Sequence, residues 1–270
     1  MEKQFERQTF AKRAKSMLSV DLRRLFVSPI FYIMVGVSLA IPILILVMTT
    51  MMDGTVTINQ QTGLPNEPIK GFDYVWQILG SIDGASMGAG GGMDLVSMCN
   101  VNMMFFLIAV PVCVFVSDDF RSGYAKNLFT VREKKTDYVL SKTVVCSLCA
   151  ACMLVAFFIG TLIGGGVSGL PFTAEGFNGA NVFFCMLAKV CLCPLFVAIF
   201  LVMSVIAKQK SWLSLCLSFG VGMFLFMMIP MLSPLNATPV HAIGCLVGSG
   251  LFAVGLGAIS DIILRKTALV

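Results

Sequence analysis

Charged residues are scarce in this sequence. Asp, Glu, Lys and Arg make up 12% of its 270 residues, whereas roughly 25% is usual in a soluble domain. Hydrophobic residues make up 57%, and the mean hydropathy is +0.91. So few charges cannot cover the surface of a soluble protein of this size. We therefore expect the lipid bilayer to be the solvent for most of the chain.

The sequence also has few of the residues from which catalytic sites in membranes are built. It contains one histidine, His241, and its long apolar stretches hold almost no Asp or Glu. Proton relays and metal sites in membranes need such groups. No G-x-x-x-x-G-K-[ST] sequence occurs, so the chain has no phosphate loop of its own for a nucleotide. These absences predict a protein that is not an enzyme and has no cofactor, with any ATP bound by a partner subunit.

Neither the net charge of +5 nor the ten cysteines point to a soluble binding function. The basic residues form short clusters between apolar stretches, without the aromatic interleaving of a nucleic-acid surface, so we expect no nucleic acid. The cysteines lie in apolar stretches or, for Cys99, at the edge of one, which is typical of small buried side chains. Cys146, Cys149 and Cys152 have metal-like spacing, but no His or second Cys pair accompanies them, so we expect no metal.

Six apolar stretches reach the length of about 20 residues that a helix needs to cross the hydrocarbon. The predicted fold is an all-α membrane protein with six transmembrane helices plus an N-terminal amphipathic interfacial helix. A cytoplasmic segment 1–28 precedes the six-span domain 29–270, which includes an outer loop 53–97 and a polar cytoplasmic segment 118–142. The predicted spans are 29–52, 98–117, 143–167, 182–207, 212–232 and 241–264.

Residues 1–28 have an apolar face and a basic face. Residues such as Met17, Leu18 and Leu25 recur at helical spacing, which indicates one apolar face. A helix of this kind can lie in the headgroup layer of the membrane, although a plain solvated helix is the alternative. In the interfacial arrangement the basic residues face anionic lipid, namely Lys3, Arg7, Lys12, Arg13, Lys15, Arg23 and Arg24.

The positive charges predict the orientation. Of the 19 Lys and Arg residues, 17 fall on one side of the predicted spans, and cytoplasmic loops retain positive charge. The chain is therefore expected to be a multi-pass protein of the cell membrane with both termini in the cytoplasm. The two exceptions are Lys70 in the outer loop and Lys189 within a span. We expect Lys189 to extend its amine to the outer interface.

Three sequence patterns bear on helix packing. Pro42, Pro111, Pro194 and Pro230 each interrupt a predicted span and are expected to bend it. Asp261 and Arg265 are four residues apart, which predicts a pair on a helix surface. Small residues spaced four apart favour close approach of helices in lipid, and they occur at Ser214, Ser218, Gly222, Gly244 and Gly248.

The stretch 117–142 resembles the segment between the second and third spans of ABC type-2 (exporter-type) transporter permeases of bacteria. Members of that family have an acidic residue, a Ser-Gly or Gly-Thr step, a Lys-Asn pair, an Arg, and then a Tyr and a Ser-Lys pair. The rest of the predicted topology is also similar to theirs. In this sequence the matching residues are Asp119, Ser122, Gly123, Lys126, Asn127, Arg132, Tyr138, Ser141 and Lys142.

The resemblance implies a permease subunit that forms the translocation path of an ABC exporter and is driven by a separate ABC ATPase subunit. It implies a permease homodimer or heterodimer, and a short coupling helix at 122–131 that docks the ATPase. A loop that only anchors to lipid headgroups is the alternative for this segment. Ion-coupled transporters, channels and non-transporting sensing or immunity components stay open as alternatives for the whole chain. The implied coupling residues are Ser122, Gly123, Lys126, Asn127, Leu128, Phe129 and Arg132.

Overall fold

The computed structural model describes residues 10–55, 71–80, 100–131, 135–173, 178–226 and 229–266, which form helices and no strands. Five of these helices are long and apolar enough to cross a membrane. The chain is therefore a helical, multi-pass membrane protein, as its composition predicts. The five helices are α2 (Pro29–Met52), α4 (Met103–Arg121), α6 (Thr136–Ser168), α7 (Gly179–Ala207) and α10 (Pro239–Lys266).

The bounds of these helices follow from local sequence. α2 begins after Ser28 with Pro29 at its first turn, where a missing backbone N–H costs nothing, and it spans the predicted stretch. α4 extends past the predicted end of its span to Arg121, and α6 begins at Thr136 rather than at 143. These two extensions carry polar residues that are buried against other helices, so their helical structure does not depend on hydropathy.

The fifth predicted span, 212–232, is divided in the structure. α8 covers Ser211–Phe226 and α9 covers Ile229–Leu232, while residues 227–228 lie outside the described part of the chain. The 16 residues of α8 extend about 24 Å at 1.5 Å per residue, less than the roughly 30 Å of hydrocarbon in a bilayer. The described residues thus contain five helices of spanning length and one shorter apolar helix.

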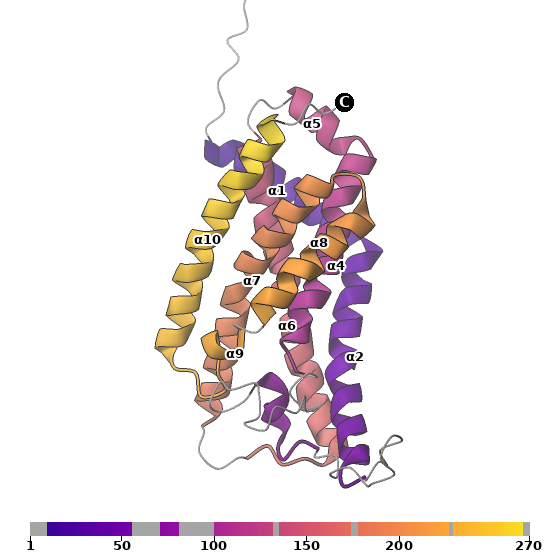
Figure 1. The fold of residues 1–270 in the computed structure, drawn as a ribbon, viewed down its shortest axis with the longest axis vertical. Helices are drawn as coiled ribbons and strands as arrows, with labels where there is room; N and C mark the ends of the chain where they lie inside the picture. Colours follow the sequence, from indigo (N-terminus) through magenta and orange to yellow (C-terminus); the bar gives the residue numbers. More distant parts are fainter. Residues whose placement is uncertain are drawn as a thin grey trace, which may run out of the picture.

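The two ends of the bundle differ in the elements they carry. α1 (Phe10–Val27), α5 (Tyr124–Val131) and the C-terminal end of α10 lie together at one end, which we call the basic end (Figure 1). The short 3-10 helix η1 (Val75–Leu79) lies at the opposite end (Figure 1). α1 runs across the bundle, whereas α2 runs along it (Figure 1). This arrangement brings the basic residues of α1, Lys126 of α5 and the basic last turn of α10 to one end.

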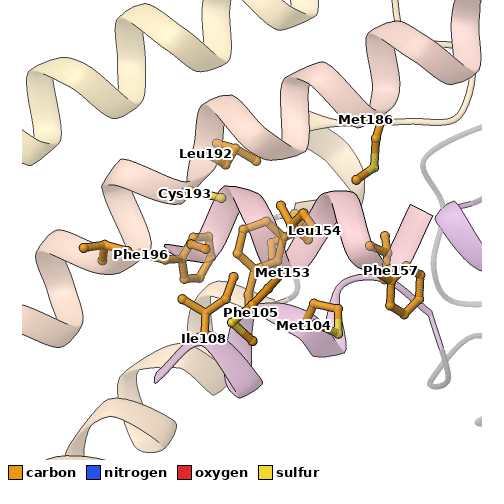
Figure 2. Close-up of a cluster of buried hydrophobic side chains, with 14 of the residues drawn as sticks. Met104, Phe105, Ile108, Met153, Leu154, Phe157, Met186, Leu192, Cys193 and Phe196 are labelled. Atoms are coloured by element: carbon orange, nitrogen blue, oxygen red, sulfur yellow. The ribbon is translucent and has the colours of Figure 1, made fainter. Parts of the chain in front are cut away.

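The core lies between α4, α6 and α7. Phe105 of α4 and Phe196 of α7 have ring centroids 4.5 Å apart, and Met153 of α6 is completely buried beside them (Figure 2). α2 packs mainly along α6, and α10 mainly along α7, with most of their other side chains exposed. Those exposed apolar faces are suited to lipid, because lipid tails are as apolar as the side chains that they would contact.

Two glycines of α6 allow α2 to approach closely. A Cβ atom added to Gly160 would collide with the carbonyl oxygen of Leu39 and lie 2.7 Å from Cγ of Pro42. One added to Gly164 would lie 2.9 Å from Cα of Ile43. A G-x-x-x-G spacing of this kind is a common device for bringing helices together in lipid.

The small residues spaced four apart on α8 and on α10 differ in whether they contact another helix. On α8, the Ser214 hydroxyl lies 2.7 Å from that of Ser204, and the Ser218 hydroxyl lies 3.2 Å from Sγ of Cys113, so these serines do pack between helices. Gly244 and Gly248 of α10 have no atom within 4 Å of an added Cβ. They make no close helix contact within the described chain.

Candidate functional site: a buried charge network at the basic end

Lys142 of α6 lies between two carboxylates from other helices. Its Nζ is 3.0 Å from Oδ1 of Asp21 in α1 and 2.6 Å from Oδ2 of Asp119 in α4. All three side chains are completely buried. A buried charge is tolerated only when it is paired and hydrogen-bonded, and here one ammonium satisfies a carboxylate on each side. Three helices that are far apart in sequence therefore meet at one cation.

Further groups contact the two carboxylates. Ser141 donates its hydroxyl hydrogen to Asp21 at 2.6 Å, and Tyr138 donates to Asp119 at 3.0 Å. Nη2 of Arg24 lies 2.7 Å from Oδ1 of Asp119. The network of Asp21, Arg24, Asp119 and Lys142 thus has two negative and two positive charges and no net charge.

Aromatic rings close the network towards α5. The ammonium of Lys142 lies 3.9 Å from the ring centroid of Phe115, and the guanidinium of Arg24 lies 4.2 Å from that of Tyr124, the first residue of α5. Both distances are within the range of cation–π attraction. Burial opposes the charge of Arg24, but Asp119 and then Asp21 outweigh it, so the pKa of Arg24 lies above its ordinary value. Arg24 is therefore a permanent cation that links α1, α4 and α5.

Local helix geometry explains why these residues converge. Met17, Asp21 and Leu25 are spaced four apart on α1, and all three are buried, because residues at this spacing share one face of a helix. Tyr138 and Lys142 have the same relation on α6. Asp119 lies on the last turn of α4, where its carboxylate contacts Arg24 of α1.

Two contacts extend this assembly. Arg13 of α1 pairs with the buried Asp137 of α6 at 3.2 Å. Lys135 donates from Nζ to the carbonyl oxygen of Leu264 at 2.6 Å and so ties the start of α6 to the end of α10. The predicted pair between Asp261 and Arg265 is confirmed, with 2.8 Å between the charged atoms.

The residues predicted to couple to an ATPase lie beside the network on one short helix and its entry. The Ser122 hydroxyl donates to the carbonyl oxygen of Asp118 at the end of α4. Gly123 has φ of +75°, a left-handed conformation that favours glycine and separates α4 from α5. Lys126 and Asn127 are exposed. Arg132 lies outside the described residues.

The apolar predicted residues of α5 already have partners in the chain. Leu128 and Phe129 are half-buried and pack against the cluster that contains Tyr138 and Val139. The Phe129 and Tyr138 rings meet edge to face, with centroids 5.3 Å apart. Phe129 therefore contributes to holding α5 on α6, whatever else its exposed part contacts.

Sequence reasoning identified part of this network and missed part. Asp119, Tyr138, Ser141 and Lys142 all belong to the motif that resembles the permease family, and the structure brings them together. Asp21 was missed, although it is the one acidic residue of α1 and falls on its apolar face. That position of a lone carboxylate is the signal that could have found it.

The expectation that all the basic residues of the N-terminal segment face lipid is wrong for two of them. Arg24 is paired with Asp119, and Arg13 with Asp137. Lys12, Lys15 and Arg23 are exposed and fit the expectation, while Lys3 and Arg7 lie outside the described residues. The side chains of Arg13 and Arg24 are 27% and 32% exposed, and their charged groups contact carboxylates at the end of α4 and the start of α6.

Lys189 of α7 is a second buried cation, and the expectation that it reaches the interface is wrong. Its side chain is completely buried. Nζ donates to Oδ1 of Asn102 at 3.0 Å and to the Ser233 hydroxyl at 2.9 Å, with the Ser233 carbonyl oxygen at 3.5 Å. None of these partners is a carboxylate, so the amine contacts only neutral oxygens. The contacts join α7 to the residue before α4 and to the residue after α9.

In comparisons with family models, with curated proteins and with solved structures, nothing matches this chain. The site itself must therefore carry the functional argument. Its charged groups form ion pairs and a cation–π contact that connect four helices. What the arrangement can do is mechanical: it holds α1, α4, α5 and α6 as one unit at the basic end.

Proposed function

We propose that this chain is the permease subunit of an ABC exporter of the type-2 class. In this proposal it lies in the cell membrane with both termini in the cytoplasm, forms the translocation path as a homodimer or heterodimer, and is driven by a separate ABC ATPase subunit. The basic end is the cytoplasmic end. α8 and α9 together form the fifth of six spans, α10 is the sixth, and α1 lies at the membrane interface.

The observation that carries the proposal is the attachment of α5 to the charge network. α5 begins at Tyr124, whose ring faces the guanidinium of Arg24, and Phe129 rests on Tyr138. Arg24 and Tyr138 both contact Asp119. A force applied to the exposed face of α5 would thus pass to α1, α4 and α6 together.

This attachment supplies what a coupling helix requires. An ATPase that changes shape on the cytoplasmic side needs a short rigid lever rather than a loose loop, because only packed elements shift as units. Lys126 and Asn127 on the exposed face of α5 would contact the ATPase. The buried network would then convert that contact into a common movement of three helices.

Co-purification with the ABC ATPases of its host tests the proposal. The tagged chain is co-expressed with each host ABC-type ATPase that lacks a membrane domain, solubilised in mild detergent and purified. The proposal predicts that one ATPase co-purifies and that Lys126→Glu reduces its recovery. The control is Lys210→Glu, which changes another exposed lysine, just after the end of α7. Failure of every ATPase to bind the parent chain would contradict the proposal.

Lys189 favours one second candidate, an ion-coupled transporter. A buried cation without a carboxylate partner inside a membrane protein is a candidate for ion or proton movement. Such a transporter would catalyse flux that follows an ion gradient in liposomes without any ATPase. That flux would be lost in Lys189→Met, whereas the ABC proposal predicts none in either protein.

A further inference from the structure

An apolar cavity opens between α6 and α7 at the end of the bundle that carries η1. Its volume is about 420 Å³, within the range of roughly 300 to 1,000 Å³ that is usual for ligand pockets. The charge network lies towards the other end of α6. The lining includes Trp76, Val155, Phe158, Val182, Phe183 and Met186.

The polar group of this lining is already satisfied. The indole N–H of Trp76 donates to the carbonyl oxygen of Phe172 at 2.7 Å. Water needs two to four polar partners to occupy a cavity, and the described side chains of the lining offer it none. The occupant must therefore be apolar.

Aromatic rings hold Trp76 in place. Its indole stacks on Phe158 with ring centroids 6.0 Å apart, and it meets Phe172 at an angle with centroids 5.8 Å apart. Val75, next in sequence, lies so close to Gly165 of α6 that a Cβ added there would be 2.6 Å from Cγ2 of Val75. η1 is thus packed tightly on α6, and the cavity has a fixed wall.

The cavity is open at the surface of the helix bundle. Phe183 and Val155 in its lining are 62% and 49% exposed, whereas Val182 and Met186 at its floor are 3% and 8% exposed. Both walls belong to helices of membrane-spanning length. The mouth therefore opens sideways onto hydrocarbon, where acyl chains are the solvent and reach the cavity without leaving the bilayer.

We propose that this cavity binds one acyl chain of a bilayer phospholipid. The described lining has no charged side chain, so recognition depends on the shape and length of the hydrocarbon chain and not on the headgroup. An acyl chain bound in this cavity sets the spacing between α6 and α7 at the η1 end of the bundle. The proposal rests on the membrane location of the helices and not on the proposed transport function.

The test uses the full chain with Trp212→Phe, which leaves Trp76 as its one tryptophan. The protein is placed in nanodiscs that contain phospholipid brominated in mid-chain, and quenching of Trp76 fluorescence is measured. Native mass spectrometry of the detergent-solubilised protein counts the phospholipids retained per chain. The proposal predicts strong quenching, one firmly retained phospholipid, and the same result with phosphatidylglycerol and phosphatidylcholine.

Variants that fill the cavity distinguish a phospholipid bound in it from the ordinary surrounding lipid. Gly179 lines the cavity, and an added Cβ there meets no atom within 4 Å, so Gly179→Leu projects into open space. Val155→Phe fills the mouth from the opposite wall and serves if Gly179→Leu fails to fold. The matched control is Gly166→Leu, on α6 outside the lining, where an added Cβ is equally unobstructed.

Each filled variant should lose the retained phospholipid and part of the quenching, while Gly166→Leu keeps both. Retention of phospholipid and equal quenching in all of these proteins would overturn the proposal, because ordinary surrounding lipid would then explain the signal. It would also be overturned if no phospholipid is retained while an amphipathic peptide displaces the brominated chain from Trp76, since the cavity would then be a cargo site.

Discussion

Asp21 and Lys142 are 121 residues apart in sequence, yet Oδ1 of Asp21 lies 3.0 Å from Nζ of Lys142 in a position that solvent does not reach. The ion pair fixes α1 to α6, and the same ammonium contacts Asp119 of α4. The N-terminal helix is therefore an integral part of the basic end and not a separate anchor. Predictions about stability and about coupling both follow from this relation.

Replacing one member of the network should destabilise the protein strongly. Asp21→Asn leaves an excess positive charge in the buried network, and breaking a buried ion pair in this way costs about 3 to 5 kcal/mol. Combining Asp21→Asn with Lys142→Met restores charge balance, so the double variant should lose less stability than the two single variants added together.

Unfolding in mixed micelles of mild detergent and sodium dodecyl sulfate measures these losses. Arg265→Ala is the control, because Arg265 is 62% exposed, so that solvent screens its ion pair with Asp261 and the pair should contribute about 1 kcal/mol or less. Additive losses in the double variant would show that Asp21 and Lys142 do not stabilise each other.

Enlarging Gly160 should separate α2 from α6. The side chain of Gly160→Leu collides with the backbone of Leu39 and with Pro42, and overpacking typically costs about 1 to 3 kcal/mol or more. Gly244→Leu is the matched control, since that glycine faces open space. Thermal melting in detergent should show a clear decrease for Gly160→Leu alone. Equal melting of the two variants would mean that α2 does not pack on α6 at this glycine.

The neutral site of Lys189 makes an asymmetric prediction. Asn102→Leu removes one acceptor from the buried amine of Lys189, which leaves a buried donor without that partner and should cost about 1 to 3 kcal/mol. Lys189→Met removes the charge and keeps an unbranched apolar chain, so it should cost less or even stabilise. Denaturation of both variants under identical conditions gives the comparison. A larger loss for Lys189→Met would show that the amine is a net source of stability.

Two residues of α5 separate docking from internal packing. Phe129→Ala should weaken binding of a partner ATPase by about 1 to 4 kcal/mol if its exposed part is an anchor. It should also lower stability, since Phe129 packs on Tyr138. Lys126→Glu should weaken binding without loss of stability, because Lys126 is exposed. Affinity measurements on the purified pair, combined with melting curves, distinguish the two effects. Undiminished affinity in both variants would remove α5 from the proposed contact.

The distribution of Lys and Arg predicts which side of the membrane each end faces. Single cysteines replacing Lys134 and Lys266 should be labelled by a membrane-impermeant thiol reagent only after the cells are opened, and one replacing Lys70 should be labelled in intact cells. These three positions lie outside α5 and the charge network. Because the native cysteines can also react, labelling of the parent chain is measured as the background. Labelling of the Lys134 replacement in intact cells would reverse the orientation.

Much of the fold could be predicted because hydropathy determines it directly. α2 occupies the predicted stretch 29–52, and α10 extends the predicted 241–264 by only a turn. The division of 212–232 into α8 and α9 was not foreseeable in the same way. Apolar residues continue throughout that stretch, and Pro230 indicates an interruption but not where the preceding helix stops.

The charge network was predictable only in part. The motif placed Asp119 and Lys142 near the two ends of the segment between the second and third predicted spans, but the sequence alone did not pair them. The participation of Asp21 and Arg24 depends on how α1 crosses the bundle, which is a tertiary property. The prediction for Lys189 failed for the same reason. Its position within a span suggested that its amine reaches the interface, but its partners Asn102 and Ser233 come from distant parts of the chain.

The most direct test of the central claim is ATP hydrolysis in proteoliposomes that contain the chain, its co-purifying ATPase, or both. The account predicts no hydrolysis by the chain alone. With the ATPase present, the hydrolysis rate should change when the permease is added, and this rate should be reduced by Lys126→Glu but not by Lys210→Glu. Hydrolysis by the isolated chain after removal of contaminating ATPases would contradict the account. So would a pair whose rate is the same with the parent chain, with Lys126→Glu and with no permease present.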